Sequence, residues 1–190
     1  TSLVSPGPGA GLTKLSNNFT WIPSGFDANP QCILKIYNSS AVVNTYPALS
    51  CSNGVQCIKQ VDSLYPGAYS WNVNCTSGIQ QKMSETRFFT VAYSNSVSLN
   101  TPLEGETTNL YNFPFTWSTT GFEGSPTCKL YVDGVMKISL VNSTYFTYSI
   151  SNFVEGSHTW YVECAYGIQK STSAARTFTV SYSGLSCGAV

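Results

Sequence analysis

The sequence predicts an all-β protein built of two tandem β-sandwich domains, with about seven strands each. Two observations support this prediction. Several stretches of the first half of the 190-residue chain recur in the second half, and within these stretches hydrophobic and polar residues alternate. A period of two residues is typical of half-buried strands, and no stretch shows the period of an amphipathic helix.

The repeat extends along almost the whole chain. "FTWIPSGFDANPQC" at 19–32 recurs as "FTWSTTGFEGSPTC" at 115–128, and "GAYSWNVNCTSGIQ" at 67–80 recurs as "GSHTWYVECAYGIQ" at 156–169. The offset grows shorter after the first matched cysteine, so the first copy carries about seven additional residues. Because a repeat of roughly 90 residues corresponds to one whole domain per copy, we expect one domain over 1–94 and a second over 95–190.

Within each copy, the alternating stretches predict strands that we name A, B, C, C′, E, F and G by analogy with immunoglobulin-like sandwiches. Strand B carries an inward tryptophan, Trp21 or Trp117. Strand C begins at the first matched cysteine, and strand F ends at the second. Clusters of Gly, Pro, Asn and Ser separate the strands, as turns require.

Seven cysteines indicate an oxidising compartment, or alternatively an unusual thermophile. Strands C and F are antiparallel neighbours in such a sandwich, so the first end of C meets the last end of F, and both cysteines face inward. We therefore predict the disulfides Cys32–Cys75 and Cys128–Cys164. "CSNGVQC" matches the length of the insertion and contains an Asn-Gly turn, which predicts Cys51–Cys57. Cys187 is left unpaired, as a buried thiol or as one half of an intermolecular bond.

The composition argues against several classes of partner. Charged residues make up 9% of the chain and the formal net charge is zero, so nothing draws it to nucleic acid or to a charged membrane surface. There is no apolar run long enough to span a bilayer. Two explanations of the low charge remain open: a secreted domain solubilised by hydroxyls and sugars, or a surface protein of an acidic habitat.

The residues offer little for catalysis. His158 is the one histidine and lies on the apolar face of its predicted strand, where we expect it to pack. Without a second base, the many Ser and Thr residues cannot form a hydrolytic triad. Once the cysteines are paired, no His or Cys cluster has the spacing of a metal site. We expect no enzyme activity, no metal and no cofactor.

Four N-glycosylation sequons occur in the chain, and they predict N-linked glycans on an extracellular protein. Strand phase turns Asn18 and Asn74 outward, and it places the other two at strand ends or turns. The acceptors are Asn18, Asn38, Asn74 and Asn142.

The two ends of the chain resemble two halves of the join between the domains. "TSLVSP" at 1–6 matches "VSLNTP" at 97–102, and the tail "SYSGLSCGAV" continues past the last strand much as "AYSNSVSLNT" does. Either end could complete the sheet of another subunit by β-strand addition. The candidate donor residues are Thr1, Ser2, Leu3, Val4, Ser5 and Pro6, or alternatively Gly184, Leu185, Ser186, Cys187, Gly188, Ala189 and Val190.

The skeleton of "FTW", "CKLYVDG", "HTWYVEC" and "TFTV" resembles the disulfide-bonded immunoglobulin- or fibronectin-type-III-like domains of archaeal surface proteins. With its two domains, sequons and few charges, the chain also resembles the subunit of the thread filaments of Sulfolobales. That resemblance implies an extracellular, glycosylated filament of head-to-tail copies joined by donor strands. Analogy with bacterial pilins favours Thr1–Pro6 as the donor.

Two hypotheses for the function follow. The first is a structural subunit of a surface filament, whose partner is another copy of the chain. The second is a tandem carbohydrate- or cell-binding adhesin module of a secreted protein. A binding module would display exposed aromatic side chains, and the tyrosines Tyr131 and Tyr161 are candidates for such a surface.

Overall fold

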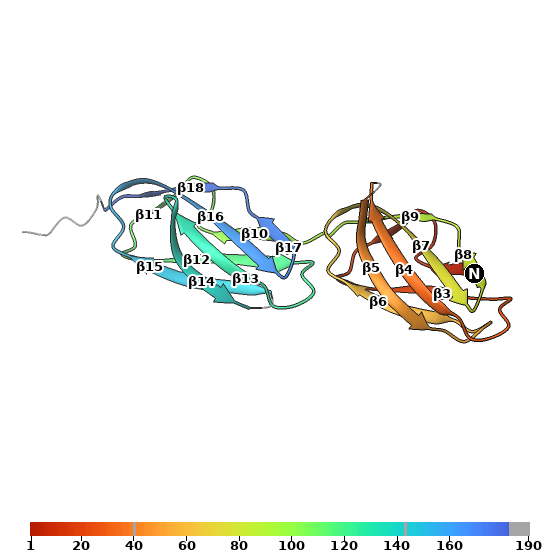
Figure 1. Cartoon of the computed structure of the whole chain (residues 1–190). Coiled ribbons are helices and arrows are strands. Elements are labelled where there is room, and N and C mark those ends of the chain that lie inside the picture. The colour runs from red at the N-terminus through yellow and green to blue at the C-terminus, as the bar shows by residue number, and fades with distance from the viewer. Residues whose placement is uncertain (40, 143, 183–190) are drawn as a thin grey trace, which may run out of the picture. The chain divides into compact units, whose positions relative to one another are not determined.

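A computed structural model describes residues 1–39, 41–142 and 144–182. The chain divides into two compact units, Thr1–Tyr93 and Ser94–Val190, a division that lies one residue before the boundary expected from the repeat. Each unit is a sandwich of two sheets (Figure 1). The described residues contain no helix that is long and apolar enough to cross a membrane.

The first domain has a three-stranded sheet in the order β1-β3-β6, and a six-stranded sheet in the order β2-β9-β7-β4-β5 with β8 paired to β7. All neighbours are antiparallel except β2 and β9. The strands are β1 (Ser2–Ser5), β2 (Ala10–Leu12), β3 (Ser16–Ile22), β4 (Gln31–Asn38), β5 (Ala41–Ser50), β6 (Cys57–Asp62), β7 (Gly67–Ser77), β8 (Gln80–Met83) and β9 (Arg87–Val91).

The second domain repeats this topology. Its sheets run β10-β12-β15 and β11-β18-β16-β13-β14, with β17 paired to β16. The strands are β10 (Ser96–Thr101), β11 (Glu106–Thr108), β12 (Asn112–Thr120), β13 (Thr127–Val132), β14 (Val135–Val141), β15 (Tyr145–Ser151), β16 (Gly156–Tyr166), β17 (Gln169–Thr172) and β18 (Arg176–Val180).

The expectation of about seven strands per domain was too low, because two predicted strands are each divided in two. Strand A breaks at Pro6 or Pro102, which lacks the N–H that a ladder needs, and its second half crosses to the other sheet. Strand G breaks at Ser84 or Ser173, where the serine hydroxyl takes the place of a backbone carbonyl as the acceptor from the neighbouring strand. The Val73 N–H donates to Ser84 Oγ over 2.9 Å, and the Val162 N–H donates to Ser173 Oγ over 3.0 Å.

Each domain has its own core of inward-facing side chains. The tryptophans of strands B and F are fully buried, and the rings of the strand F tryptophans pack against Phe19 and Phe115. None of the four indole N–H groups has a hydrogen-bond partner among the described residues. These rings therefore stabilise the fold through apolar burial alone. The four are Trp21, Trp71, Trp117 and Trp160.

Equivalent side-chain hydrogen bonds occur at matching positions within each of the two domains. The Arg87 guanidinium donates to the Val4 carbonyl over 3.3 Å, and Arg176 donates equally to Asn100. A second pair of equivalent hydrogen bonds holds the last residues of each domain against a loop. The hydroxyl of Tyr93 donates to Leu64 O, and that of Tyr182 to Phe153 O. The repeat therefore preserves side-chain contacts that fix the loops, and not only the apolar core.

Candidate functional site

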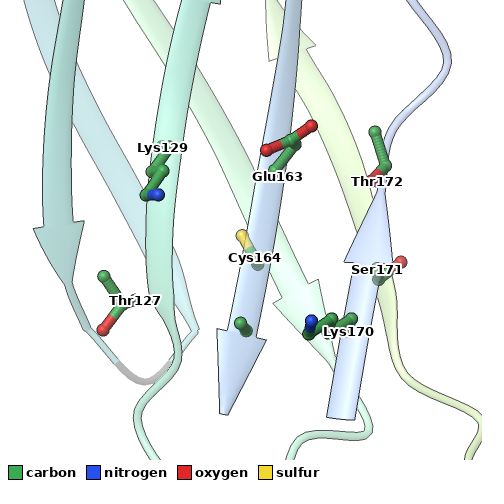
Figure 2. Close-up of a pocket in the computed structure, with 8 residues that line it drawn as sticks. Thr127, Lys129, Glu163, Cys164, Lys170, Ser171 and Thr172 are labelled. Carbon is green, nitrogen blue, oxygen red and sulfur yellow. The ribbon is translucent and has the colours of Figure 1, made fainter. Parts of the chain in front are cut away.

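A groove lies on the outer face of the larger sheet of the second domain (Figure 2). It encloses about 340 Å³ and crosses β13, β16 and β17. Antiparallel pairing sets the residues in rows across these strands. Thr127, Ala165 and Lys170 form one row, and Lys129, Glu163 and Thr172 form the next.

The groove is hollow because a small residue forms its floor. Ala165 lies on the central strand β16, and longer side chains stand on both flanking strands. In the first domain the residue in the same position is Thr76, which lies between Gln31 and Gln81. The replacement of Thr by Ala, together with the change of flanking residues, gives the second domain its depression.

Two lysines face this groove, and neither takes part in an ion pair with another described residue. Among the residues that the structure describes, the ion pairs are Arg87–Glu85 and His158–Asp133, and neither includes Lys129 or Lys170. Within the same residues, neither ammonium group forms a side-chain hydrogen bond. The Glu163 carboxylate lies on the strand between them. The groove thus offers two cationic groups and one anionic group to a ligand.

A stacked pair of tyrosines borders the groove. Tyr131 and Tyr161 are direct cross-strand partners. They lie two residues along their strands from Lys129 and Glu163, on the same face of the sheet. Their ring centroids are 4.7 Å apart and the planes are nearly parallel. Burial of the Tyr131 ring, a side-chain hydrogen bond with Glu163 and the charge of that carboxylate raise the pKa of Tyr131. The two rings support each other, and they supply an apolar edge beside the charged groups.

His158 does more than pack. Its ring lies against Phe153 and Phe178, as expected, but both ring nitrogens also face oxygen atoms. Nδ1 is 2.7 Å from Asp133 Oδ2, and Nε2 is 2.8 Å from the Val154 carbonyl. Burial opposes the charged imidazolium, but the hydrogen bonds to these oxygens and the charge of Asp133 prevail and raise the pKa of His158.

Asp133 responds in the opposite direction. Burial favours its protonated form, but hydrogen bonds from His158 and the Thr159 N–H, together with the imidazolium charge, hold its pKa below the usual value. Asp133 and Gly134 both have positive φ in the turn between β13 and β14, which suits an Asp-Gly hairpin turn. The pair is an anchor for this turn, and no nucleophile accompanies it in the described hydrogen bonds.

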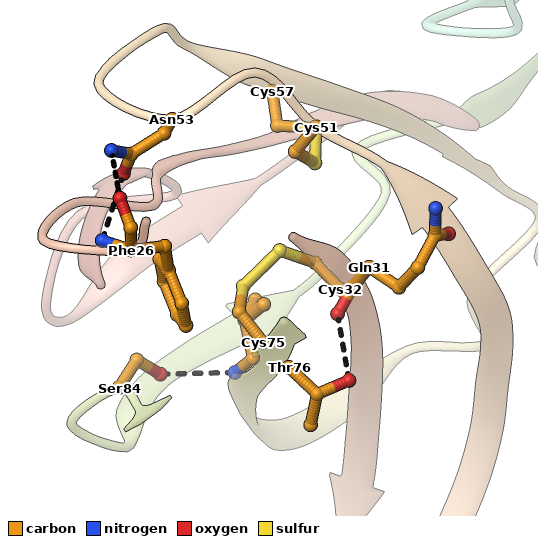
Figure 3. Close-up of a disulfide and its surroundings, with 10 residues drawn as sticks. Phe26, Gln31, Cys32, Cys51, Asn53, Cys57, Cys75, Thr76 and Ser84 are labelled. Carbon is orange, nitrogen blue, oxygen red and sulfur yellow. Dashed lines mark hydrogen bonds between the residues drawn. A yellow bond between two sulfur atoms is a disulfide. The ribbon is translucent and has the colours of Figure 1, made fainter. Parts of the chain in front are cut away.

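The structure contains the same three disulfides that the sequence predicts. Cys32 lies directly opposite Cys75 in the β4–β7 ladder, and Cys128 directly opposite Cys164 in β13–β16. Figure 3 shows the first of these bonds beside the buried ring of Phe26. Cys32–Cys75 and Cys128–Cys164 therefore each join neighbouring strands of one sheet. Cys187 lies outside the described residues.

The Cys51–Cys57 loop is held against the loop that joins β3 to β4. Asn53 donates from Nδ2 to the Phe26 carbonyl over 2.7 Å and accepts from the Phe26 N–H over 3.3 Å, as Figure 3 shows. The Gly54 N–H donates to the Pro23 carbonyl. The insertion is thus an ordered part of the first domain rather than a loose extension.

The four sequon asparagines differ in exposure. Asn18, Asn38 and Asn142 are exposed, but Asn74 is half-buried and its Oδ1 is buried without a hydrogen-bond partner among the described residues. Asn142 donates from Nδ2 to the Tyr145 carbonyl over 2.7 Å. Strand phase alone did not reveal that neighbours on β4 and β8 would enclose Asn74, which faces outward as predicted.

The first residues of the chain lie in their own domain. β1 pairs with β3 from Ser2 opposite Ile22 to Ser5 opposite Thr20, and Leu3 is part of the apolar core. Thr1–Pro6 stays a predicted donor that no partner chain tests, and in the single chain this segment fills a sheet position of its own domain. The alternative donor, Gly184–Val190, lies outside the described residues.

Sequence reasoning found the tyrosine pair but missed the groove and the His158 anchor. The signal for the groove was the change from Asn74, Thr76 and Gln81 in the first copy to Glu163, Ala165 and Lys170 in the second. Those differences acquire meaning only when the ladder places the three residues side by side. Among the described residues, no cluster of His, Cys, Asp and Glu could hold a metal ion.

Comparison with known proteins assigns the chain to no specific family. No protein-family model matches the sequence, and no curated protein matches it significantly. Among solved structures, it is similar to the fibronectin(III)-like modules of CbhA from Clostridium thermocellum, at 18% identity and a TM-score of 0.36, over 94% of this chain and 91% of that one. A marsupial T cell receptor is similar at 12% identity and a TM-score of 0.40, over 94% and 73%.

The strand order and the inward tryptophans define the class of protein. The chain is a tandem of two immunoglobulin- or fibronectin-type-III-like β-sandwich domains. Its three disulfides indicate an oxidising environment, as secreted and extracellular proteins have.

Proposed function

We propose that the chain is a structural subunit of an extracellular, glycosylated filament in which copies join head to tail by β-strand addition. This role depends on packing and strand pairing, so it requires no active site and no cofactor. The partner is another copy of the chain.

One observation about the fold carries the proposal. In each domain the chain enters at one end of the sandwich and leaves at the other. β1 starts opposite the last residue of β3, and β9 ends at Val91 opposite Gly67, the first residue of β7. The second domain does the same, from Ser96 to Val180. A chain with this polarity supports a contact that repeats without closing, which gives a filament.

The C-terminal segment is the better candidate for the joint. β1 occupies its own sheet and buries Leu3, so donating it to a neighbour would expose this core position. Gly184–Val190 follows the last strand at the sequence position where β10 follows β9. We therefore propose that this segment pairs with a sheet edge of the next subunit.

Electron microscopy of three forms of the chain tests both parts of the proposal. The first form is the full chain, the second ends at Tyr182, and the third carries Ser2→Cys and Ile22→Cys, a cross-strand pair that would lock β1 in place. We expect threads from the full and locked chains and none from the shortened one. Threads from the full and shortened chains, with none from the locked chain, would identify Thr1–Pro6 as the donor. Discrete monomers from the full chain would refute the filament.

Peptide mass spectrometry of native material tests the glycans. We expect sugars on the exposed acceptors Asn18, Asn38 and Asn142, and lower occupancy on the half-buried Asn74. Unmodified asparagine at all four sites would remove glycosylation from the proposal.

A further inference from the structure

We propose that the second domain binds an acidic saccharide in the groove across β13, β16 and β17. This inference goes beyond the filament role and does not depend on it. The groove lies on the outer face of one sandwich, and either a polymeric or a monomeric chain can carry it.

The charges of the groove define the ligand. Lys129 and Lys170 stand on the two flanking strands without counter-ions among the described residues, which favours an anionic group between them. Glu163, however, projects from the central strand and would repel a simple anion. A ligand that satisfies all three groups must carry both a negative charge and hydrogen-bond donors.

A saccharide with a carboxylate or sulfate group meets these requirements. Its anionic group can accept hydrogen bonds from the lysines, while its hydroxyls donate to Glu163 and exchange hydrogen bonds with Thr127 and Thr172. The apolar face of a sugar ring can lie over the Ala165 floor. The stacked rings of Tyr131 and Tyr161 border that position with further apolar surface.

The first domain provides an internal comparison. Its corresponding rows are Gln31, Thr76, Gln81 and Ile33, Asn74, Met83, which contain no cation. The position of Glu163 is taken there by a sequon asparagine. The same surface of the fold thus bears a predicted glycan acceptor in one domain, and in the other a groove that is suited to receive a sugar.

Saturation-transfer-difference NMR on the full chain provides the test, because it reports weak binding to monomers and filaments alike. The probe is trigalacturonic acid, with maltotriose as the neutral trisaccharide and citrate as the anion without a sugar. We expect signals from trigalacturonic acid alone. Equal binding of maltotriose would overturn the role of the lysines, and equal binding of citrate would overturn the role of the sugar.

Three variants locate the site. Lys129→Ala with Lys170→Ala should weaken binding at least about fivefold, as expected for the loss of two exposed charge contacts. Ala165→Thr fills the floor as in the first domain and leaves every charge in place, so it should weaken binding at least as much as the lysine variant does. Lys137→Ala, a matched control on β14 outside the groove, should change the affinity by less than about twofold. Binding that survives both groove variants, or no binding by the unaltered chain, overturns the proposal.

Discussion

The outer faces of the two larger sheets carry different residues on the same arrangement of strands. In the first domain the central rows hold Asn72 and Asn74, and in the second they hold Tyr161 and Glu163. The inward rows of both domains keep Trp, Val and Cys in register. The difference shows that the inward residues maintain the sandwich, while the outward residues are free to acquire separate roles.

The same contrast appears at one corner of each domain. In the first domain the Tyr69 hydroxyl donates to the Tyr65 carbonyl over 2.8 Å. In the second, His158 takes this position, binds the corresponding carbonyl of Val154, and adds the bond to Asp133. A hydrogen bond between neutral groups in one domain is thus replaced in the other by one between an imidazole and a carboxylate, so we expect this corner of the second domain to respond to pH.

The largest expected effect tests whether the two cores are equivalent. Replacing both cysteines of Cys32–Cys75 with Ala should destabilise the first domain by about 4 kcal/mol, and the same change at Cys128–Cys164 should cost the second domain nearly as much. The sequence separations of the two cysteine pairs, 43 and 36, correspond to a difference of only about 0.2 kcal/mol in chain entropy. Calorimetry of each variant should show one transition lowered and the other unchanged. Losses that differ twofold would mean that the cores are not equivalent.

The next effect concerns the element that only the first domain has. Replacing Cys51 and Cys57 with Ala should destabilise that domain by about 2 kcal/mol, because the closed loop is short. Asn53→Ala removes two hydrogen bonds to the Phe26 backbone and should cost about 1 kcal/mol. Ser52→Ala, an exposed neighbour in the same loop, serves as a control. Denaturant unfolding that shows no loss for Asn53→Ala would mean that the loop is not held by these bonds.

Because of His158 and Asp133, the stability of the second domain should depend on pH in a way that the stability of the first domain does not. Since the pKa of His158 is raised on folding, its contribution is complete below about pH 6.5 and is lost as pH rises through the folded pKa. The pKa of Asp133 is lowered, so its contribution is present above about pH 4 and is lost as pH falls through the folded pKa. Between pH 5 and 9 the second domain should lose under about 1 kcal/mol, because the carboxylate is partly exposed.

Thermal unfolding of both domains across this pH range measures the effect. His158→Gln should flatten the profile of the second domain. Tyr69→Phe, the matched change at the corner of the first domain, should lower its stability by a similar amount at every pH in this range. A pH slope that persists in His158→Gln would assign the dependence to other groups.

The smallest expected effect tests the outer faces. Exchanging Tyr131 and Tyr161 for Lys and Asn, the residues of the first domain, should cost about 0.5–1 kcal/mol through loss of the stacked pair. The reciprocal change at Lys35 and Asn72 should gain about the same. Urea unfolding of each variant reports the difference. If neither change alters stability, the tyrosine pair has no structural role, and only a binding role remains for it.

Much of the fold could be predicted because the information is local and occurs twice. Trp21 and Trp117 lie on matching alternating stretches, and a period of two assigns such residues to the buried face wherever the strand pairs. The division of strands A and G was less visible. A single Pro6 or Ser84 interrupts a ladder only in relation to its partner strand, and one sequence does not show that partner.

The sequence by itself determined the two domains, their β class and the pairing of Cys32, Cys75, Cys128 and Cys164. Those features follow from repetition and from alternation along the chain, which the order of residues contains directly. Only the tertiary structure decided that β1 lies in its own sheet, that His158 joins Asp133 to Val154, and that Ala165 forms the floor between two lysines. These contacts join residues on different strands, and their distances depend on register and burial, which arise only when the chain packs.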